Sequence, residues 1–256
     1  MSELRADLRP VALVTGVGRR IGIGAAIATR LASDGFDIAF THWAPYDARM
    51  PWGSDAEAGV SVGTAIEEAG ARSLSVPADL ERPETAGHVF DEVERALGPV
   101  SVLVLYHCES VDSGILDTTV ESFDRHMAVN ARATWQLIGE LGRRFTGSHG
   151  SGRIIALTSD HTVHNLPYGA SKAALDRITL AAAHELARLG VTANVINPGA
   201  TDTGWMTPDQ IADVSRATPL GRVGQPVDVA NLVSFLCSTE GGWVNGQLLS
   251  SNGGIA

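Results

Sequence analysis

Short apolar or β-branched runs alternate with longer amphipathic stretches along most of this 256-residue chain. The run Val100–Leu105 is nearly continuous in apolar residues, which is typical of a strand buried on both faces of a sheet. The alternation predicts an α/β fold with one doubly wound, parallel sheet and helices on both of its faces. We expect strands at residues 11–15, 37–41, 73–77, 100–105, 153–157, 191–196 and 247–250, and helices at about 22–33, 58–69, 83–97, 120–145, 168–189 and 227–237.

The composition fits one domain with a substantial core, since 44% of the residues are hydrophobic and 19% are charged. The formal charge of −10, without any basic run, argues against a nucleic-acid surface. Cys108 and Cys237 have neither disulfide nor metal-ligand spacing, so no metal is expected. No uncharged apolar run approaches the ~20 residues that span a bilayer, and the N-terminus lacks a signal-peptide core. We therefore expect a single domain over residues 1–256 of a soluble, cytoplasmic protein, with neither nucleic acid nor membrane as a partner.

The chain contains a single lysine, Lys172, which follows Tyr168 by four residues, and arginine occupies every other Lys/Arg position. An ammonium carries three rotatable donors on a flexible stem, whereas a guanidinium is a broad, fixed fork. Residues four apart share one face of a helix, where an ammonium would lower a phenol pKa that is ordinarily about 10. The pair could thus prepare Tyr168 for proton transfer near neutral pH. A core tyrosine beside a solvated lysine would have the same spacing, so other motifs must decide.

A glycine-rich segment follows the first expected strand, where residues 15–24 contain four glycines together with Arg19 and Arg20. Glycine in a strand-to-helix turn lets the backbone approach a pyrophosphate, and the helix N-terminus supplies N–H donors. Such a match alone is weak, but its place after the first strand of an alternating pattern predicts a dinucleotide site.

With these motifs, residues 11–254 resemble a short-chain dehydrogenase/reductase, and 3-oxoacyl-[acyl-carrier-protein] reductases are the most similar type. The turn is similar to the family's Thr-Gly-x-x-x-Gly-Ile-Gly, with two extra residues before Gly22. The resemblance implies a Rossmann-type sheet with strand order 3-2-1-4-5-6-7, and a homotetramer or homodimer. The residues that match cofactor contacts of the family are Gly16, Arg19, Arg20, Gly22, Ile23, Gly24, His42, Asp79, Leu80, Tyr168, Lys172, Pro198, Gly199, Thr201 and Thr203.

The resemblance also implies the reaction, which is reversible hydride transfer between a nicotinamide and a carbonyl or secondary alcohol. Tyr168 would protonate the developing alkoxide, and Lys172 would hold the ribose hydroxyls and stabilise tyrosinate. Ser159 would hydrogen-bond the carbonyl oxygen, and Asn130 would position a water relay. Two alternatives stay open: a nucleotide-binding sensor or structural subunit without catalysis, and an alcohol dehydrogenase that works in the oxidative direction.

The choice of cofactor depends on charge. An acidic residue at the end of the second strand would bind a ribose 2′-hydroxyl and favour NAD, but this chain has Thr41-His42-Trp43 there. Arg19 and Arg20 in the glycine-rich turn could hold a 2′-phosphate bidentately. NADP(H) is therefore favoured, and NAD(H) stays possible.

Two departures from the family pattern concern the walls of the site. Residues 105–108 read Leu-Tyr-His-Cys where the family usually has Asn-Asn-Ala-Gly, so Tyr106 and His107 must point away or the cofactor must sit differently. Ser159 and Tyr168 are nine positions apart, whereas the family typically has about thirteen, which shortens the loop at the substrate mouth.

The substrate is a small-molecule carbonyl or alcohol that the sequence leaves undefined. Residues 201–218 are expected to form a lid over it. The long connection 42–55 carries Trp43, Tyr46 and Trp52 and is expected to pack down, either as a structural flap or subunit contact, which is slightly favoured, or over the adenosine end of the cofactor. The candidate substrate contacts are His161, His164, Trp205 and Met206.

Overall fold

Seven parallel strands form one sheet in the computed structural model, which describes residues 9–255. The strands are β1 (Val11–Thr15), β2 (Asp37–His42), β3 (Ser73–Pro77), β4 (Val100–Leu105), β5 (Gly152–Leu157), β6 (Val191–Asn197) and β7 (Leu248–Ser250). Their order across the sheet is β3-β2-β1-β4-β5-β6-β7, so the doubly wound fold expected from the sequence is confirmed. The helices are α1 (Ile23–Ser33), α2 (Ala44–Asp47), α3 (Ala58–Glu68), α4 (Thr85–Ala96), α5 (Val120–His126), α6 (Ala133–Arg144), α7 (Leu166–Glu185), α8 (Pro208–Ala217) and α9 (Pro226–Cys237).

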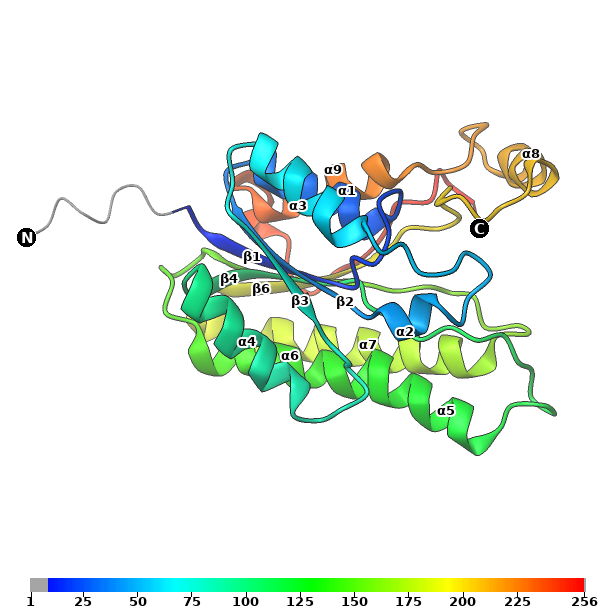
Figure 1. Cartoon of the computed structure of the whole chain (residues 1–256), viewed down its shortest axis with the longest axis horizontal. Helices are drawn as coiled ribbons and strands as arrows, with labels where there is room; N and C mark the ends of the chain where they lie inside the picture. Colours follow the sequence, from blue (N-terminus) through cyan, green and yellow to red (C-terminus); the bar gives the residue numbers. More distant parts are fainter. Residues whose placement is uncertain (1–8, 256) are drawn as a thin grey trace, which may run out of the picture.

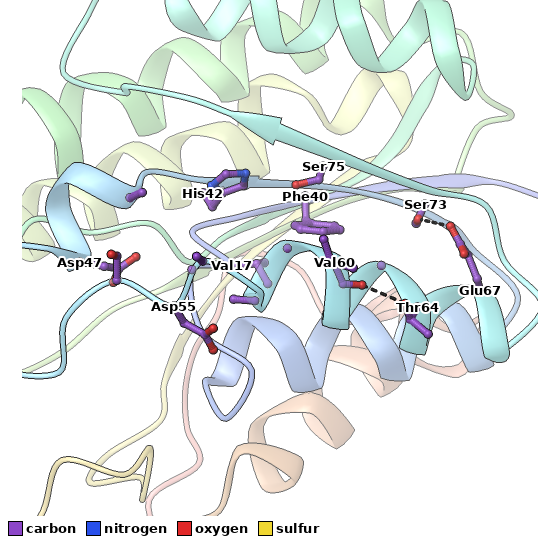
Figure 2. Close-up of a pocket in the computed structure, with 17 residues that line it drawn as sticks. Val17, Phe40, His42, Asp47, Asp55, Val60, Thr64, Glu67, Ser73 and Ser75 are labelled. Carbon is purple, nitrogen blue, oxygen red and sulfur yellow. Dashed lines mark hydrogen bonds between the residues drawn. The ribbon is translucent and has the colours of Figure 1, made fainter.

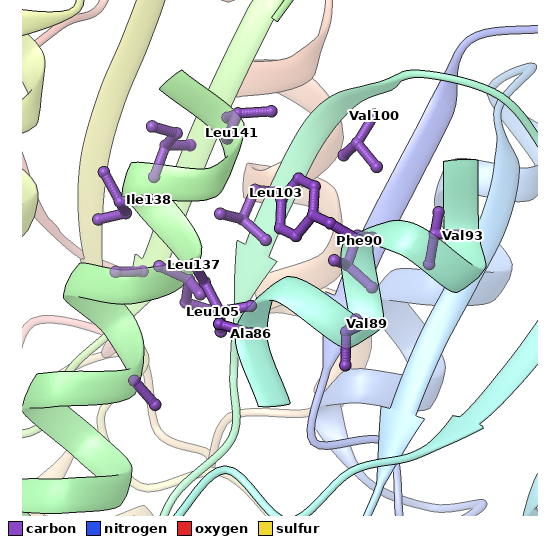
Figure 3. Close-up of a cluster of buried hydrophobic side chains, with 14 of the residues drawn as sticks. Ala86, Val89, Phe90, Val93, Val100, Leu103, Leu105, Leu137, Ile138 and Leu141 are labelled. Carbon is purple, nitrogen blue, oxygen red and sulfur yellow. The ribbon is translucent and has the colours of Figure 1, made fainter. Parts of the chain in front are cut away.

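Helices cover both faces of the sheet (Figure 1), with α1, α3 and α9 on one side and α4, α6 and α7 on the other. Successive strand residues point to opposite faces, so Leu13 belongs to one buried cluster and Val14 to the other. Figure 3 shows the cluster under α4 and α6, to which Phe90, Leu137 and Leu103 all belong. Burial on both faces is the reason why β4 is apolar at nearly every position.

The long helix expected at 120–145 is interrupted by one π-helical segment. α5, the segment Met127–Arg132 and α6 follow one another without a break, and Asn130 lies within the wide segment. Such π segments insert an extra residue into a helix and occur frequently at functional sites. Here the segment faces α7 and places the fully buried Asn130 near the end of β4.

Two regions between the core elements have structure that the sequence pattern did not indicate. The connection 42–55 contains the short helix α2, and the expected lid contains α8, which begins at a capping box formed by Thr207 and Gln210. None of the helices in residues 9–255 combines the length and apolar character needed to cross a membrane. We expected no signal peptide because the N-terminus lacks an apolar core. Residues 1–8 of that N-terminus lie outside the described residues.

Candidate active site

Tyr168 and Lys172 lie in the first turns of α7, beside the carboxyl ends of the central strands. Lys172 is 2% exposed, and its Nζ donates a hydrogen bond to the Leu157 carbonyl at the end of β5 (2.8 Å). The same Nζ lies 5.6 Å from the centre of the Tyr168 ring. The lone lysine is therefore not a solvated surface charge, and its compact ammonium fills a closed space between β5 and the phenol.

The direction of the Tyr168 pKa corrects the expectation from the sequence. Burial raises the pKa of Tyr168 well above 10, and the nearby Cys108 and Tyr106 act in the same direction. Burial also lowers the pKa of Lys172. Spacing on a helix predicted a lowered phenol pKa, but removal from water disfavours both charged forms and is the largest effect on each of the two pKa values. Tyr168 is thus protonated at neutral pH in this structure.

Ser159 meets Tyr168 although the loop between them is short. Ser159 follows β5 directly, and its hydrogen bond to Tyr168 lowers the pKa of the phenol, against the larger effect of burial. The Ser159 hydroxyl also accepts the His161 backbone N–H (3.2 Å), which stabilises the start of the loop. α7 begins at Leu166, so the loop reaches the helix two residues before Tyr168. The two hydroxyls therefore point into one space.

The Asn130 side chain hydrogen-bonds the backbone of Glu109, the residue that follows the unusual Leu-Tyr-His-Cys segment at 105–108. Its Oδ1 accepts the Glu109 N–H (2.8 Å), and its Nδ2 donates to the Glu109 carbonyl (2.9 Å). Nδ2 also donates to the Ser171 hydroxyl (2.8 Å), which in turn donates to the Tyr168 carbonyl (2.8 Å). Asn130 thus connects the end of β4 with the first turn of α7.

The glycine-rich turn has the geometry of a phosphate cradle. Gly16 has φ of +80°, and a Cβ at this position would lie 2.6 Å from the His107 Cα, so only glycine fits. α1 begins after Gly22, which offers no side chain to cap the helix. The positive end of the helix dipole therefore faces the turn, where it suits the pyrophosphate of a dinucleotide.

His107 points down into the sheet, away from the cleft. Its Nε2 lies 3.0 Å from the Val129 carbonyl, which can only accept, so Nε2 carries the proton. Its Nδ1 then accepts from the Thr15 hydroxyl (2.7 Å). Burial lowers the pKa of His107 to about 3, and the nearby Lys172 adds to this shift. His107 is therefore a neutral, structural residue.

Tyr106 turns the other way, under the start of α1. Its ring edge would lie 2.8 Å from a Cβ at Gly24, so the ring occupies the space that glycine leaves. Burial raises the pKa of Tyr106, and a hydrogen bond from the Ile23 N–H opposes that shift. The phenol oxygen of Tyr106 thus reaches the first residue of α1, beside the phosphate cradle.

Both arginines of the turn are engaged by other parts of the chain. The Arg19 guanidinium donates to the Thr203 carbonyl (2.6 Å) and lies 5.0 Å from the centre of the Trp52 ring. Arg20 pairs with Asp55 at 2.8 Å. A phosphate at this turn would have to compete with these contacts.

The remaining predicted cofactor residues lie at the carboxyl ends of the strands. His42 ends β2, and Asp79 and Leu80 follow β3. Pro198 and Gly199 follow β6, and Gly199 has φ of +60° against the side chain of Asn252. Thr201 forms an isolated bridge with Gly224, and Thr203 is buried.

The four candidate substrate residues separate into two groups. His161 and His164 are exposed in the loop before α7, and His164 is the one non-glycine residue of the described chain with positive φ (62°). Trp205 and Met206 precede α8, and Trp205 packs against Trp52 with ring centres 4.8 Å apart. Among residues 9–255, no group of three or more His, Cys, Asp or Glu side chains could hold a metal ion.

A cavity of about 450 Å³ opens beside the turn, between α3, the edge strand β3 with its neighbour β2, and the α2 region. Figure 2 shows His42, Asp47 and Asp55 around one end of it and Ser73 and Glu67 around the other. None of the four catalytic matches lines this cavity. The cavity is therefore separate from the catalytic matches and adjoins the glycine-rich turn at Val17 and Gly18.

Three residues without a signal of their own in the sequence, Glu109, Arg49 and Asp47, also face the site, together with Tyr46 of the aromatic connection 42–55. Glu109 is buried and receives a bidentate ion pair from Arg49, with N–O distances of 3.1 and 2.8 Å. Tyr46 hydrogen-bonds Cys108, and Asp47 packs against Gly18. The unusual length and aromatic content of the connection 42–55 were the only signal for them, and spacing alone could not show where that connection folds.

Comparison with known proteins adds three relatives to this picture. A family model described as enoyl-(acyl carrier protein) reductase matches residues 16–256. The chain is 36% identical over 250 residues to the uncharacterized oxidoreductase YjdA of Bacillus subtilis, and the match covers 96% of each chain. It is 36% identical over 267 residues to a chloroplastic NADPH-dependent aldehyde reductase-like protein of Arabidopsis thaliana, covering 95% of this chain and 93% of the relative. Among solved structures, the angucycline C-6 ketoreductase LanV with bound NADP has a TM-score of 0.83 and 29% identity, covering 96% of this chain and 95% of LanV.

Proposed function

Because this chain belongs to the short-chain dehydrogenase/reductase family and is an NAD(P)-dependent oxidoreductase, we propose that it is an NADPH-dependent ketoreductase. The observation that carries the proposal is the meeting of Ser159, Tyr168 and Lys172 where β5 ends and α7 begins. The ketoreductase LanV and the plant NADPH-dependent aldehyde reductase-like protein support carbonyl reduction. We include 3-oxoacyl thioesters among the substrates to be tested, since that type resembles the chain in its sequence motifs.

Three side chains would carry out the proton chemistry. NADPH, when bound, supplies the hydride. Tyr168 donates its proton to the carbonyl oxygen, and its raised pKa keeps it in the protonated form that this direction requires. Ser159 hydrogen-bonds the same oxygen, and the Lys172 ammonium stabilises the tyrosinate that remains. Asn130 acts as a positioning residue, because its side-chain groups are occupied by Glu109 and Ser171.

The preference for NADP(H) is supported by Arg19 and Arg20 at the turn and by the absence of a carboxylate at the end of β2. If Arg19 left the Thr203 carbonyl, or Arg20 left Asp55, its guanidinium could donate two parallel hydrogen bonds to a 2′-phosphate. We expect NADPH to bind at least tenfold more tightly than NADH, which corresponds to ~1.4 kcal/mol. Fluorescence titration of the two dinucleotides checks this, and equal affinities would exclude it.

Single-turnover oxidation of bound NADPH tests the reaction itself. Ketones, aldehydes and a 3-oxoacyl thioester are added in turn to the preformed complex, and the loss of nicotinamide absorbance is followed. Wild-type protein is expected to oxidise NADPH with at least one of these carbonyls, whereas Tyr168→Phe should bind NADPH but not oxidise it. NADPH binding without oxidation by any carbonyl would favour the non-catalytic alternative.

A further inference from the structure

Residues 43–55, called the strap below, fold back onto the glycine-rich turn. The Asp47 carboxylate packs so closely on Gly18 that a Cβ there would overlap Asp47 Oδ2. Asp55 pairs with Arg20 at 2.8 Å. Asp47 therefore covers the backbone of Gly18, and Asp55 pairs with the guanidinium of Arg20. Both are groups that could otherwise bind the oxygens of a phosphate.

The strap also reaches the catalytic end of the cleft. Burial raises the pKa of Tyr46, and its neighbours Cys108, Glu109 and Tyr168 act in the same direction. Tyr46 also hydrogen-bonds the Cys108 thiol. Arg49 lies 5.6 Å from the centre of the Tyr46 ring and forms the bidentate pair with Glu109. The phenol of Tyr46 thus covers the wall formed by the end of β4 and the start of α7.

A third contact joins the strap to the lid. The Trp52 ring lies 4.8 Å from Trp205 and 5.0 Å from the Arg19 guanidinium, and its Nε1 donates to Asp47 (3.1 Å). Arg19 in turn binds the Thr203 carbonyl at the start of the lid. The strap, the turn and the lid therefore form one closed cluster in which the turn's own arginine is the central residue.

We propose that the strap is an internal competitor of the dinucleotide, and that the Arg49–Glu109 ion pair is the latch that holds it in the cleft. The inference rests on the proposed function, because it assumes that NADPH uses the turn, Cys108 and Tyr168. Asp47 and Asp55 stand in for phosphate groups at the turn, and Tyr46 occupies the space beside the catalytic phenol. NADPH binds after the strap has opened, so its apparent affinity is reduced by the fraction of molecules that are closed.

The choice of Arg49–Glu109 as the latch follows from its surroundings. The Glu109 side chain is 4% exposed, and Asn130 holds both backbone polar groups of Glu109, so this end of the pair is fixed. The Arg49 side chain is 44% exposed and belongs to the movable segment. A fixed, buried acceptor and a half-exposed donor make a contact that can break from the strap side without disturbing β4.

Stopped-flow NADPH binding, followed by energy transfer from tryptophan to the nicotinamide, tests the proposal with Arg49→Met. In the wild type, the observed rate should level off at high NADPH, at the opening rate of the strap. Arg49→Met should raise this plateau and lower the NADPH dissociation constant by about fivefold or more. Hydrogen exchange of residues 43–55 should speed up in the same variant without NADPH.

Arg72→Met is the matched control. Arg72 pairs with Asp37 at the opposite end of β2, with side-chain exposures of 49% and 3% that resemble those of the latch. It should lose similar thermal stability but keep wild-type NADPH kinetics.

If wild type binds NADPH and Arg49→Met binds it equally or more weakly, the competitor inference is wrong and the proposed function is untouched. If neither protein binds NADPH although exchange shows the strap open in Arg49→Met, the proposed function fails and the inference fails with it. Binding by Arg49→Met alone would support both.

Discussion

Asn130 holds Glu109 at both of its backbone polar groups, through one acceptor at 2.8 Å and one donor at 2.9 Å. The side-chain amide of Asn130 bonds the N–H and the C=O of Glu109, as a residue of a neighbouring antiparallel strand would. It extends the hydrogen bonding of β4 beyond the point where the sheet ends. The positions of Cys108 and Glu109, and of every group that contacts them, therefore depend on one side chain in the π-helical segment.

Asn130→Ala is expected to lower the free energy of unfolding by about 2–4 kcal/mol, because it leaves two buried backbone groups of Glu109 without partners. Asn130→Asp should lower it as well, since a carboxylate cannot donate to the Glu109 carbonyl. Urea denaturation measures both. Asn231→Ala on the exposed side of α9 is the control and should change the free energy by roughly 0.5 kcal/mol or less. A loss no larger than in the control would show that water replaces the amide.

Lys172→Arg is expected to lose most of the turnover although it keeps the charge. The ammonium is 2% exposed and fits between the Leu157 carbonyl and the Tyr168 ring, where a planar guanidinium has no room. We expect kcat to fall by about 100-fold or more, as for the loss of a group that assists proton transfer. Turnover near the wild-type value, in a variant that still binds NADPH, would contradict the special role of the lysine.

His107 should make the protein sensitive to acid. Its pKa is about 3 in the folded protein and about 6.5 in an unfolded chain, so below pH 6.5 the unfolded chain binds a proton that the folded protein does not. Stability from this residue is complete above pH 6.5 and falls by about 1.4 kcal/mol per pH unit towards pH 3.

His107→Gln can keep both hydrogen bonds without titrating, and is expected to show a flatter dependence of unfolding free energy on pH between 6 and 4. The exposed His88→Gln serves as the control and should match the wild type. The quantity to compare is the difference in unfolding free energy between wild type and His107→Gln at each pH. The titration of the carboxylates contributes equally to both proteins and cancels in this difference. Parallel pH profiles for wild type and His107→Gln would mean that His107 does not carry this linkage.

Asp55→Asn should sharpen the choice of cofactor. It releases Arg20 from a carboxylate at 2.8 Å and leaves a free guanidinium at the turn. We expect the ratio of NADH to NADPH dissociation constants to rise by about threefold or more, since a screened surface pair is worth up to ~1 kcal/mol. Parallel titrations measure the ratio, and an unchanged ratio would show that Arg20 does not meet the 2′-phosphate.

The fold was predictable because strands that are buried on both faces of a parallel sheet are nearly continuous runs of apolar residues in the sequence. β4 is apolar at nearly every position, and helices separate the successive strands along the chain, so strand bounds were right to within one or two residues. The meeting of Ser159 with Tyr168 depended on the family pattern, since a separation of nine positions does not by itself bring two hydroxyls together.

What the sequence did not reveal depends on contacts between distant segments. The pKa of Tyr168 rises because the phenol is buried beside Tyr106 and Cys108, which follow β4, and spacing on one helix does not show this contact. Tyr106 and His107 are adjacent yet point to opposite sides, because the chain directly after β4 still alternates its side chains. Arg49 meets Glu109 across 60 residues, and nothing in its local sequence distinguishes it from the other arginines.

The fit between Tyr106 and Gly24 limits the mutational routes open to this protein. An asparagine at 106, which the family usually has, would leave a void beside Gly24, while a larger residue at 24 would collide with the present ring. The family pattern already combines a glycine at 24 with an asparagine at 106, so position 106 can change while the glycine stays. A larger residue at 24, in contrast, is expected only after the tyrosine has been replaced by a smaller side chain. The tyrosine therefore fixes the glycine, whereas the glycine leaves position 106 free to vary.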